Sequence, residues 1–244
     1  MMKVTILGNN GPYPVAGGAC SSYLIESKGT RILADAGSGS LSNLMKIIDP
    51  ADLDAIILTH LHWDHITDIP ILHYYLYISK LNGRDVVPIP LYLPRTPAGV
   101  YDTLAGFDMY KIHTLKDMQT IFVKNIEVET AQMTHPVETY ALGFSSEGKS
   151  IVYSGDTTYN KRLPMFAEGC DLLITDSSFL DSQLKKTSPH MSALQSAEVA
   201  AKAGVKRLLL SHQVPGVDKN AYAMEAKLVF SKAETTKLMG VYEV

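Results

Sequence analysis

The feature that most constrains this chain is a cluster of histidines directly after a short apolar run. The run Ala55–Leu58 reads as a β-strand, and after Thr59 the chain continues His60-Leu61-His62-Trp63-Asp64-His65. A helix cap or a solvated surface would explain one or two of these polar side chains, but not four. Neutral imidazole and carboxylate are the ligands that zinc and similar ions prefer. The motif therefore predicts a metal site where a strand ends.

The spacing within this motif predicts two metal ions rather than one. His60 and His62 can reach one ion from a turn, whereas Asp64 and His65 lie further around the turn and can reach a neighbouring ion. A lone histidine at a strand end is usually a surface residue. Several candidates in the same position favour a shared site, because chemistry is often placed on the loops after strands. The further candidates that follow predicted strands are His135, Asp156 and His212.

Composition and charge limit the kind of protein this chain can form. With 244 residues, 46% of them hydrophobic, the chain can build a full core. The 22 basic and 25 acidic residues give a net charge of −3, which argues against a generic basic nucleic-acid binder. No apolar run is long enough to cross a membrane. Cys20 and Cys170 form no CxxC pair, which favours a reducing cytoplasm. We expect one cytoplasmic domain over residues 1–244.

Short apolar runs alternate with helical patterns along the chain. This order predicts an α/β fold with sheets packed face to face and helices outside. The helix at Ser192–Ala203 is the best defined, because Ser192 can cap it, Gln195 stands three residues on and Gly204 can end it. The other helices are predicted at Leu41–Ile48, Ile69–Ser79, Gly99–Gly106 and Tyr222–Phe230. The strands are predicted at Val4–Leu7, Ser22–Glu26, Arg31–Asp35, Ala55–Leu58, Leu91–Leu93, Gln119–Val123, Ile126–Ala131, Ala141–Ser145, Ser150–Ser154, Leu172–Thr175 and Arg207–Leu210.

The motifs T-H-x-H-x-D-H, T-H, S-G-D-T and S-H, in this order between Asp35 and His212, resemble those of the metallo-β-lactamase superfamily. The resemblance implies a four-layer αββα sandwich of two mixed β-sheets flanked by helices. It implies that Asp156 bridges two ions. Asp35 matches an aspartate that supports the histidines from behind, although a simple turn aspartate explains it equally well. The implied ligands are His60, His62 and His135 for the first ion, and Asp64, His65 and His212 for the second.

Within that superfamily the chain resembles the ribonuclease Z-like phosphodiesterase branch. His190, between Ser188 and Ser192, matches a histidine that faces the scissile phosphate in that branch. True β-lactamases usually lack a histidine at the position of His65, and flavo-di-iron relatives carry glutamate at the position of His62. The chain also departs from the branch: only 20 residues separate His135 from Asp156. The long basic arm of tRNA-processing members is absent, which argues against tRNA as the substrate.

The resemblance and the charges of the site together suggest a mechanism. Two divalent ions outweigh the charges of Asp64, Asp156 and a bridging hydroxide, so the site should attract a small anionic substrate. In this hypothesis the metal-bridging hydroxide attacks a small or short-chain phosphodiester. Asp64 positions the hydroxide and takes its proton, and His190 protonates the leaving oxygen. Zinc is the first choice of metal, with manganese or iron as alternatives, since the same ligands suit all three.

Two other functions fit the same residues. One is a thioester or lactone hydrolase on this fold, and the other is a non-catalytic module that holds metal. Ribonuclease Z-like proteins are commonly homodimers, which leaves a homodimer possible here. The tyrosine-rich stretch Leu72–Ile78 could line a pocket, pack a dimer or face the core as a helical stripe. We expect structural roles for His73, in a helix, and His113, ahead of a turn.

Overall fold

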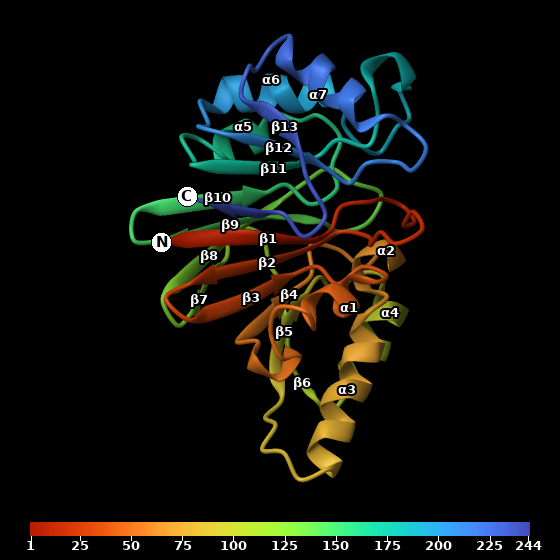
Figure 1. Ribbon diagram of the computed structural model, residues 1–244, viewed down its shortest axis with the longest axis vertical. Helices are drawn as coiled ribbons and strands as arrows, with labels where there is room; N and C mark the ends of the chain where they lie inside the picture. Colours follow the sequence, from red (N-terminus) through yellow and green to blue (C-terminus); the bar gives the residue numbers. More distant parts are fainter.

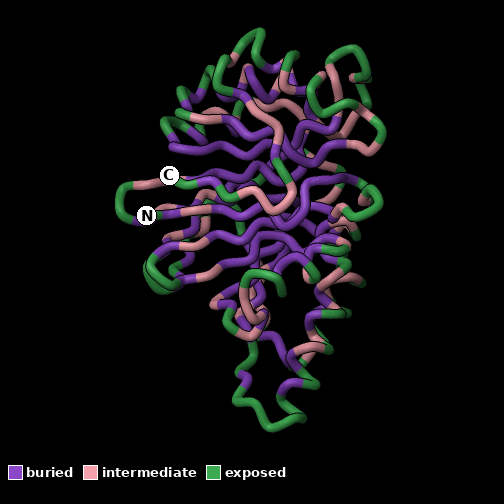
Figure 2. Tube along the Cα trace, in the orientation of Figure 1, coloured by how far each residue is buried: buried purple, intermediate pink, exposed green.

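The strands of this protein are buried because most of them are covered on both faces. β11 (Leu172–Asp176) and β12 (Leu208–Ser211) are buried along their whole length, as expected for parallel strands inside a layered α/β fold. The computed structural model describes residues 1–244 and places the strands in two sheets of seven. Figure 2 shows that burial follows the strands and that exposure gathers in the connecting loops.

The first sheet has the strand order β14-β1-β2-β3-β4-β5-β6. Its first part is antiparallel, and the strands from β3 to β6 run parallel. The strands are β1 (Met2–Gly8), β2 (Ser22–Ser27), β3 (Thr30–Ala34), β4 (Ala55–Ile57), β5 (Ile89–Leu93), β6 (Tyr110–Thr114) and β14 (Val241–Glu243).

The second sheet has the order β13-β12-β11-β10-β9-β8-β7 and is also mixed. β7 to β10 pair antiparallel, and β10 to β13 pair parallel. Besides β11 and β12 its strands are β7 (Thr120–Val123), β8 (Ile126–Gln132), β9 (Tyr140–Ser146), β10 (Lys149–Tyr153) and β13 (Ala233–Thr235).

Helices cover the outer face of each sheet and complete four layers (Figure 1). One apolar cluster fills the space between the sheets, and two others fill the spaces between each sheet and its helices. This arrangement confirms the predicted αββα sandwich of two mixed sheets. The helices over the first sheet are α1 (Ser40–Leu44), α2 (Trp63–Ile66), α3 (Ile69–Leu81) and α4 (Ala98–Ala105), and those over the second are α5 (Arg162–Phe166), α6 (Ala193–Ala203) and α7 (Lys219–Lys227).

The predicted caps of α6 are present. The backbone N–H of Gln195 donates to Ser192 Oγ at 3.1 Å, and Gly204 ends the helix with a φ of 64°. None of the helices combines the length and the apolar character that a membrane crossing requires.

Some predicted boundaries were wrong. The helix expected at Leu41–Ile48 ends at Leu44, because Met45 and Ile47 have no core to face and are exposed. The helix expected at Tyr222–Phe230 begins earlier, since Asp218 caps it by accepting the N–H of Asn220. His113 lies within β6, whereas the sequence suggested a position ahead of a turn.

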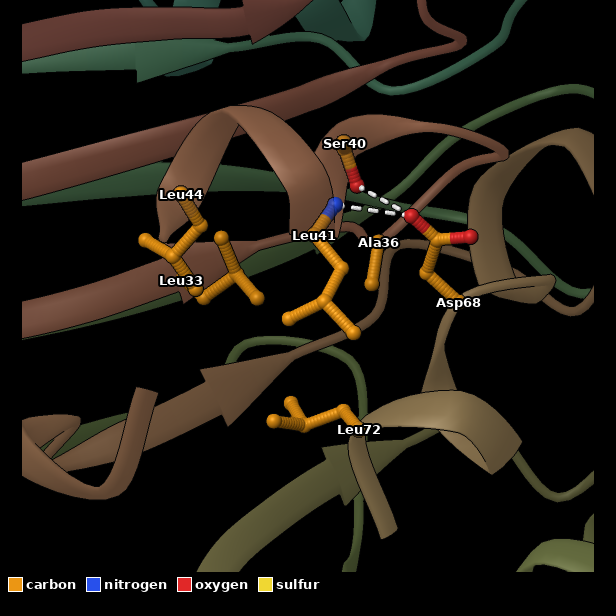
Figure 3. A pocket seen from close by; sticks show the side chains of 7 residues that line it. All are labelled: Leu33, Ala36, Ser40, Leu41, Leu44, Asp68 and Leu72. Carbon is orange, nitrogen blue, oxygen red and sulfur yellow. Dashed lines mark hydrogen bonds between the residues drawn. The ribbon is translucent and has the colours of Figure 1, made fainter. Parts of the chain in front are cut away.

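The contact between α1 and α3 shows how the loop after β3 is fixed (Figure 3). Asp68 accepts a hydrogen bond of 2.7 Å from the backbone N–H of Leu41, at the start of α1. Leu41, Leu44 and Leu72 close around a space too narrow to admit water. This packing fixes the segment 35–41, which begins at Asp35, beside the predicted ligand His65.

Candidate metal centre

The strand ends meet at one end of the sandwich and carry the predicted site residues with them. His60 follows β4, Asp156 follows β10 and His212 follows β12. These three strands lie in the parallel parts of the two sheets, so within each sheet their carboxyl ends point the same way. His135 arrives from the end of β8. Asp64 and His65 lie in α2, and His62 precedes that short helix. All seven predicted ligands come together in overlapping groups whose ligand atoms lie within 4.8 Å of one another.

The first half-site consists of His60, His62 and His135. The Nδ1 atom of His62 lies 3.1 Å from His60 Nε2 and 3.1 Å from His135 Nε2. Burial is the main cause that lowers the pKa of all three imidazoles. They are therefore neutral at pH 7, with nitrogen lone pairs available on three converging rings.

The second half-site consists of Asp64, His65 and His212. His212 Nε2 lies 3.1 Å from Asp64 Oδ2, and burial is nearly complete around both histidines. Burial opposes a charge on His65 and His212, but the neighbouring Asp156 carboxylate outweighs it and raises the pKa of both.

Asp156 lies between the two half-sites. Its Oδ2 atom is 3.5 Å from His60 Nε2 and 3.4 Å from both His65 Nε2 and His212 Nε2. Burial alone would raise the pKa of Asp156, but the surrounding histidines hold it well below its usual range. This carboxylate is therefore ionised and faces both groups of nitrogen atoms.

Two buried atoms at the centre have no hydrogen-bond partner. They are His65 Nε2 and Asp156 Oδ1. A buried polar atom without a partner is costly, and folded proteins rarely keep one without a role for it. Imidazole nitrogen and carboxylate oxygen are the donors that zinc and related ions prefer. These clusters are able to bind metal ions, and the unpartnered atoms fit that role.

Asp35 contacts the second half-site from behind. Its Oδ2 accepts 2.7 Å and 2.9 Å hydrogen bonds from His65 Nδ1 and the Tyr153 hydroxyl, and its Oδ1 accepts the N–H of Thr59 at 2.8 Å. Because Nδ1 of His65 is held this way, its Nε2 faces the centre. The structure thus places Asp35 against a predicted ligand, and its backbone adopts a φ of 58° there.

Gly11, in the loop between β1 and β2, packs against the imidazole of His212. A Cβ atom at Gly11 would lie 2.0 Å from His212 Nε2, 2.1 Å from Cε1 and 2.5 Å from Cδ2. Contact with three ring atoms at once indicates that the glycine covers the face of the ring. The N–H of Gly11 also donates to the Gln213 carbonyl. Only glycine fits this position, so the loop helps to fix His212.

His190 lies beside the predicted ligands, and a residue that sequence reasoning missed holds it there. Its Nδ1 donates to Asp176 Oδ2 at 2.7 Å, and its ring stacks on His212 with centroids 5.1 Å apart. Burial opposes a charge on His190, but Asp176 outweighs it and raises the pKa to about 9. Asp176 Oδ1 also accepts from Ser178 Oγ, which lies 2.9 Å from His212 Nδ1. The signal for Asp176 was its place directly after the predicted strand Leu172–Thr175.

The two remaining histidines lie outside these groups. His73 contacts Asp108 at 3.0 Å and stacks on Phe107, while His113 stacks on Tyr92. Both contacts are local packing, in keeping with structural roles.

Comparisons with known proteins agree with this geometry. Residues 30–213 match the family described as the beta-lactamase superfamily domain. The chain is 32% identical over 236 residues to the probable metallo-hydrolase YhfI of Bacillus subtilis, covering 94% of both chains. It is 29% identical over 246 residues to ribonuclease Z of Mycolicibacterium gilvum, covering 88% of this chain and 85% of the relative.

Solved structures show the same fold. The crystal structure of the metallo-β-lactamase fold protein YhfI from Bacillus subtilis superposes with a TM-score of 0.95 at 30% identity, covering 99% of this chain and 98% of that one. The short form of human tRNase Z shares the fold with a TM-score of 0.79 at 20% identity, covering 99% and 98%. In this chain the segment between His135 and Asp156 holds only the β9–β10 hairpin. The protein therefore belongs to the metallo-β-lactamase superfamily, as a metallo-hydrolase of its ribonuclease Z-like branch without the tRNA-binding arm.

Proposed function

We propose that this metallo-hydrolase cleaves small or short-chain phosphodiesters with the help of two divalent ions. Zinc is our first choice of metal, with manganese or iron as alternatives. His60, His62 and His135 would hold one ion, Asp64, His65 and His212 the other, and Asp156 would contact both. The observation that carries the phosphodiester proposal is His190, which lies against His212 but is not needed to complete either set.

The chain's own residues divide the work around the substrate. Bound ions would supply positive charge for the phosphoryl oxygens and would lower the pKa of water in the site. Interactions with His212 and His65 outweigh burial and lower the pKa of Asp64, so its carboxylate is ionised and able to accept a proton. His190 carries a proton up to a pKa of about 9 in the metal-free protein, and it would donate that proton to the leaving oxygen. Asp176 would keep the ring of His190 oriented toward that oxygen.

The size of the substrate follows from what surrounds the site. The short β9–β10 hairpin offers no extended arm, and the chain has a net charge of −3. A long polyanion would therefore find little basic surface to hold it. The relative named ribonuclease Z supports phosphodiester chemistry, while these two features favour a small substrate over tRNA.

A leaving-group comparison tests the role of His190. We expect His190→Ala to keep its metal content and to lose roughly 10²–10⁴-fold in turnover, because a positioned acid contributes that much. The loss should be larger for a phosphodiester with an alkoxide leaving group than for one that releases p-nitrophenolate. His113→Ala, which removes a histidine remote from the site, is the matched control. An equal loss on both substrates would contradict the proton-donor role, and no loss on either would contradict the proposal for His190 altogether.

A substrate screen tests the reaction class. The metal-loaded protein would be offered bis-p-nitrophenyl phosphate, an aryl thioester and a lactone under the same conditions. The proposal predicts the highest kcat/KM on the phosphodiester. A preference for the thioester or the lactone would assign the same site to acyl chemistry. Absence of turnover on all three, in protein that holds its ions, would favour a metal-holding module.

A further inference from the structure

The only tryptophan of the chain is exposed beside the metal centre. Trp63 stands between His62, which belongs to the first half-site, and Asp64, which belongs to the second. It is 66% exposed, whereas His65 and Ile66 in the same short helix are buried. The packing of the domain therefore uses the inner side of α2 and leaves most of Trp63 in solvent.

The backbone of α2 holds Trp63 in a fixed place. The N–H groups of His65 and Thr67 donate to the carbonyls of His62 and Trp63, each at 3.0 Å. The N–H of Ala36 donates to the carbonyl of His65 at 2.7 Å, which ties the helix to the loop after β3. A ring carried on such a turn is already ordered before a ligand arrives, and this lowers the entropic cost of binding.

Helix geometry directs the Trp63 side chain toward the metal centre. The Cα–Cβ bonds of a helix tilt toward its N-terminus, and Trp63 is the first residue of α2. His62, the residue before it, lies 3.1 Å from both His60 and His135 through its Nδ1 atom. Because His62 is only half-buried, solvent reaches the first half-site next to Trp63. The ring therefore leans toward the half-sites and lies on their solvent side.

We propose that Trp63 binds a planar aromatic group of the substrate by stacking, an inference that rests on the proposed phosphodiesterase function. Aromatic rings attract one another in offset-stacked and edge-to-face arrangements, and an exposed tryptophan offers the largest ring for such a contact. Tryptophan is also enriched among the residues that dominate binding energy. An alkyl chain would need an apolar groove, but the neighbours of Trp63 in the chain are the polar residues His62 and Asp64. The substrate class is thus a phosphodiester that carries an aromatic ring, either a nucleobase or a simple aryl group.

The aromatic group on Trp63 is the one that stays on phosphorus. Trp63 opens α2, which packs on the first sheet, whereas His190 precedes α6, which packs on the second. In the proposed function His190 gives its proton to the leaving oxygen. The leaving group therefore lies on the side of the second sheet, and the retained group lies on the side of the first, beside Trp63.

Two esters with the same leaving group test this assignment. Bis-p-nitrophenyl phosphate and methyl p-nitrophenyl phosphate both release p-nitrophenolate, but one retains an aryl group and the other a methyl group. We expect Trp63→Ala to lower the ratio of kcat/KM for the aryl ester over the methyl ester by roughly 5–150-fold, the usual cost of removing one stacked ring. The ratio cancels differences in intrinsic reactivity and in metal content. Trp63→Phe should recover most of it. The control is Phe122→Ala, at an aromatic side chain that is 72% exposed on β7, and it should keep the wild-type ratio.

Tryptophan fluorescence tests the contact without any turnover. Since the chain has one tryptophan, its emission reports on Trp63 alone. Phenyl phosphate added to the zinc-loaded protein should change this emission, whereas saturating methyl phosphate should change it far less. Adenosine 5′-monophosphate then identifies the source of the ring. Tighter binding than that of phenyl phosphate indicates a nucleobase, and weaker binding indicates a simple aryl group.

Failure of stacking and failure of phosphodiester cleavage give different results. If both esters are cleaved, but Trp63→Ala keeps the wild-type ratio and phenyl phosphate leaves the emission unaltered, stacking on Trp63 is overturned and the phosphodiesterase function stands. If phenyl phosphate changes the emission but neither ester is cleaved, the phosphodiesterase function is overturned and the aromatic contact stands. An equal loss on both esters in Trp63→Ala would contradict the assignment of Trp63 to the retained group.

Discussion

The two half-sites share Asp156 but are held by different kinds of atoms. In the first, the anchors next to the rings are neutral oxygens: His60 Nδ1 contacts Thr59 Oγ1, which donates in turn to Asp35, and His135 Nδ1 donates to the Pro189 carbonyl. In the second, His65 is anchored by the Asp35 carboxylate, and His212 reaches the Asp176 carboxylate through Ser178. Burial keeps the histidines of the first set neutral, while Asp156 favours charge on those of the second. His62 and His135 in the first set are only half-buried, whereas His65 and His212 in the second are buried.

This contrast indicates how each half-site should respond to change. A set of neutral imidazoles on loops can take an ion without first losing protons. A buried set held by carboxylates depends on every support around it, because low dielectric makes each charge expensive to leave unpaired. We therefore expect the second half-site to be the more sensitive to mutation and to pH.

The largest effect should come from Asp156→Ala, since this is the one carboxylate that both half-sites share. We expect loss of both ions and collapse of turnover, well beyond the 10–100-fold that loss of an outer support costs. Metal analysis after dialysis, with circular dichroism to verify the fold, is the measurement. Asp102→Ala removes an exposed carboxylate that pairs with Arg95 and should change neither property. Retention of two ions by Asp156→Ala would break the idea of a shared ligand.

Gly11→Ala should separate the half-sites. The added methyl group would lie 2.0 Å from His212 Nε2, so the ring or the loop must move. We expect the variant to keep one ion, in the first half-site, and to lose the other. Gly99→Ala is the control, because a methyl group there meets no atom within 4 Å. Two tightly held ions in Gly11→Ala would show that the loop does not fix His212.

Asp35→Asn should have a smaller effect on the same half-site. Asparagine keeps the size of the side chain and tolerates the positive φ, but it removes the charge that holds His65. The affinity for one ion should fall by about 10–100-fold. The other ion should weaken less, because His60 reaches Asp35 only through Thr59. Competition with a chromophoric chelator would measure both affinities. The control is Asp68→Asn, a carboxylate that caps α1 away from the ions. Equal weakening of both ions would contradict the link between Asp35 and the second half-site.

The smallest expected difference concerns pH. Asp156 outweighs burial and raises the pKa of His212, and raises that of His65 well above its usual range, in the metal-free protein. These histidines therefore keep their protons to higher pH, and an entering ion must displace them. The first half-site, with its lowered pKa values, releases none. Affinity for the second ion should therefore rise by about tenfold per pH unit for each proton displaced, until the pH passes the raised pKa. Calorimetry in buffers of different ionisation enthalpy counts these protons, and equal proton release by both ions would remove the contrast.

The sequence predicted the layers and the inner strands of the two sheets, because buried strands carry a clear pattern of apolar residues. It missed β6, β13 and β14, which are edge strands of their sheets, and two of them, β13 and β14, have only three residues each. The helix predicted at Leu41–Ile48 extends beyond the end of α1. Met45 and Ile47 are apolar, as core residues are, but they lie in an exposed turn. Local sequence patterns indicate secondary-structure propensity and the periodicity of apolar residues. They do not indicate which apolar side chains find a packing partner in the fold.

The site shows the same limit. The motif from His60 to His65 was recognisable in the sequence, since packing and helix capping rarely place three histidines and an aspartate within six residues. Asp176 and Gly11 were not, because their roles depend on contacts made across the fold. Asp176 had only its place at a strand end, and Gly11 is one of 17 glycines with nothing local to mark it.

The number of ions per chain tests the central claim most directly. Metal-free protein would be loaded separately with zinc, manganese and iron, dialysed, and analysed for metal and protein in the same sample. The two half-sites around Asp156 predict two ions per chain for at least one of these metals, falling to one in Gly11→Ala and to none in Asp156→Ala. A well-folded wild-type protein that never exceeds one ion per chain would contradict the account.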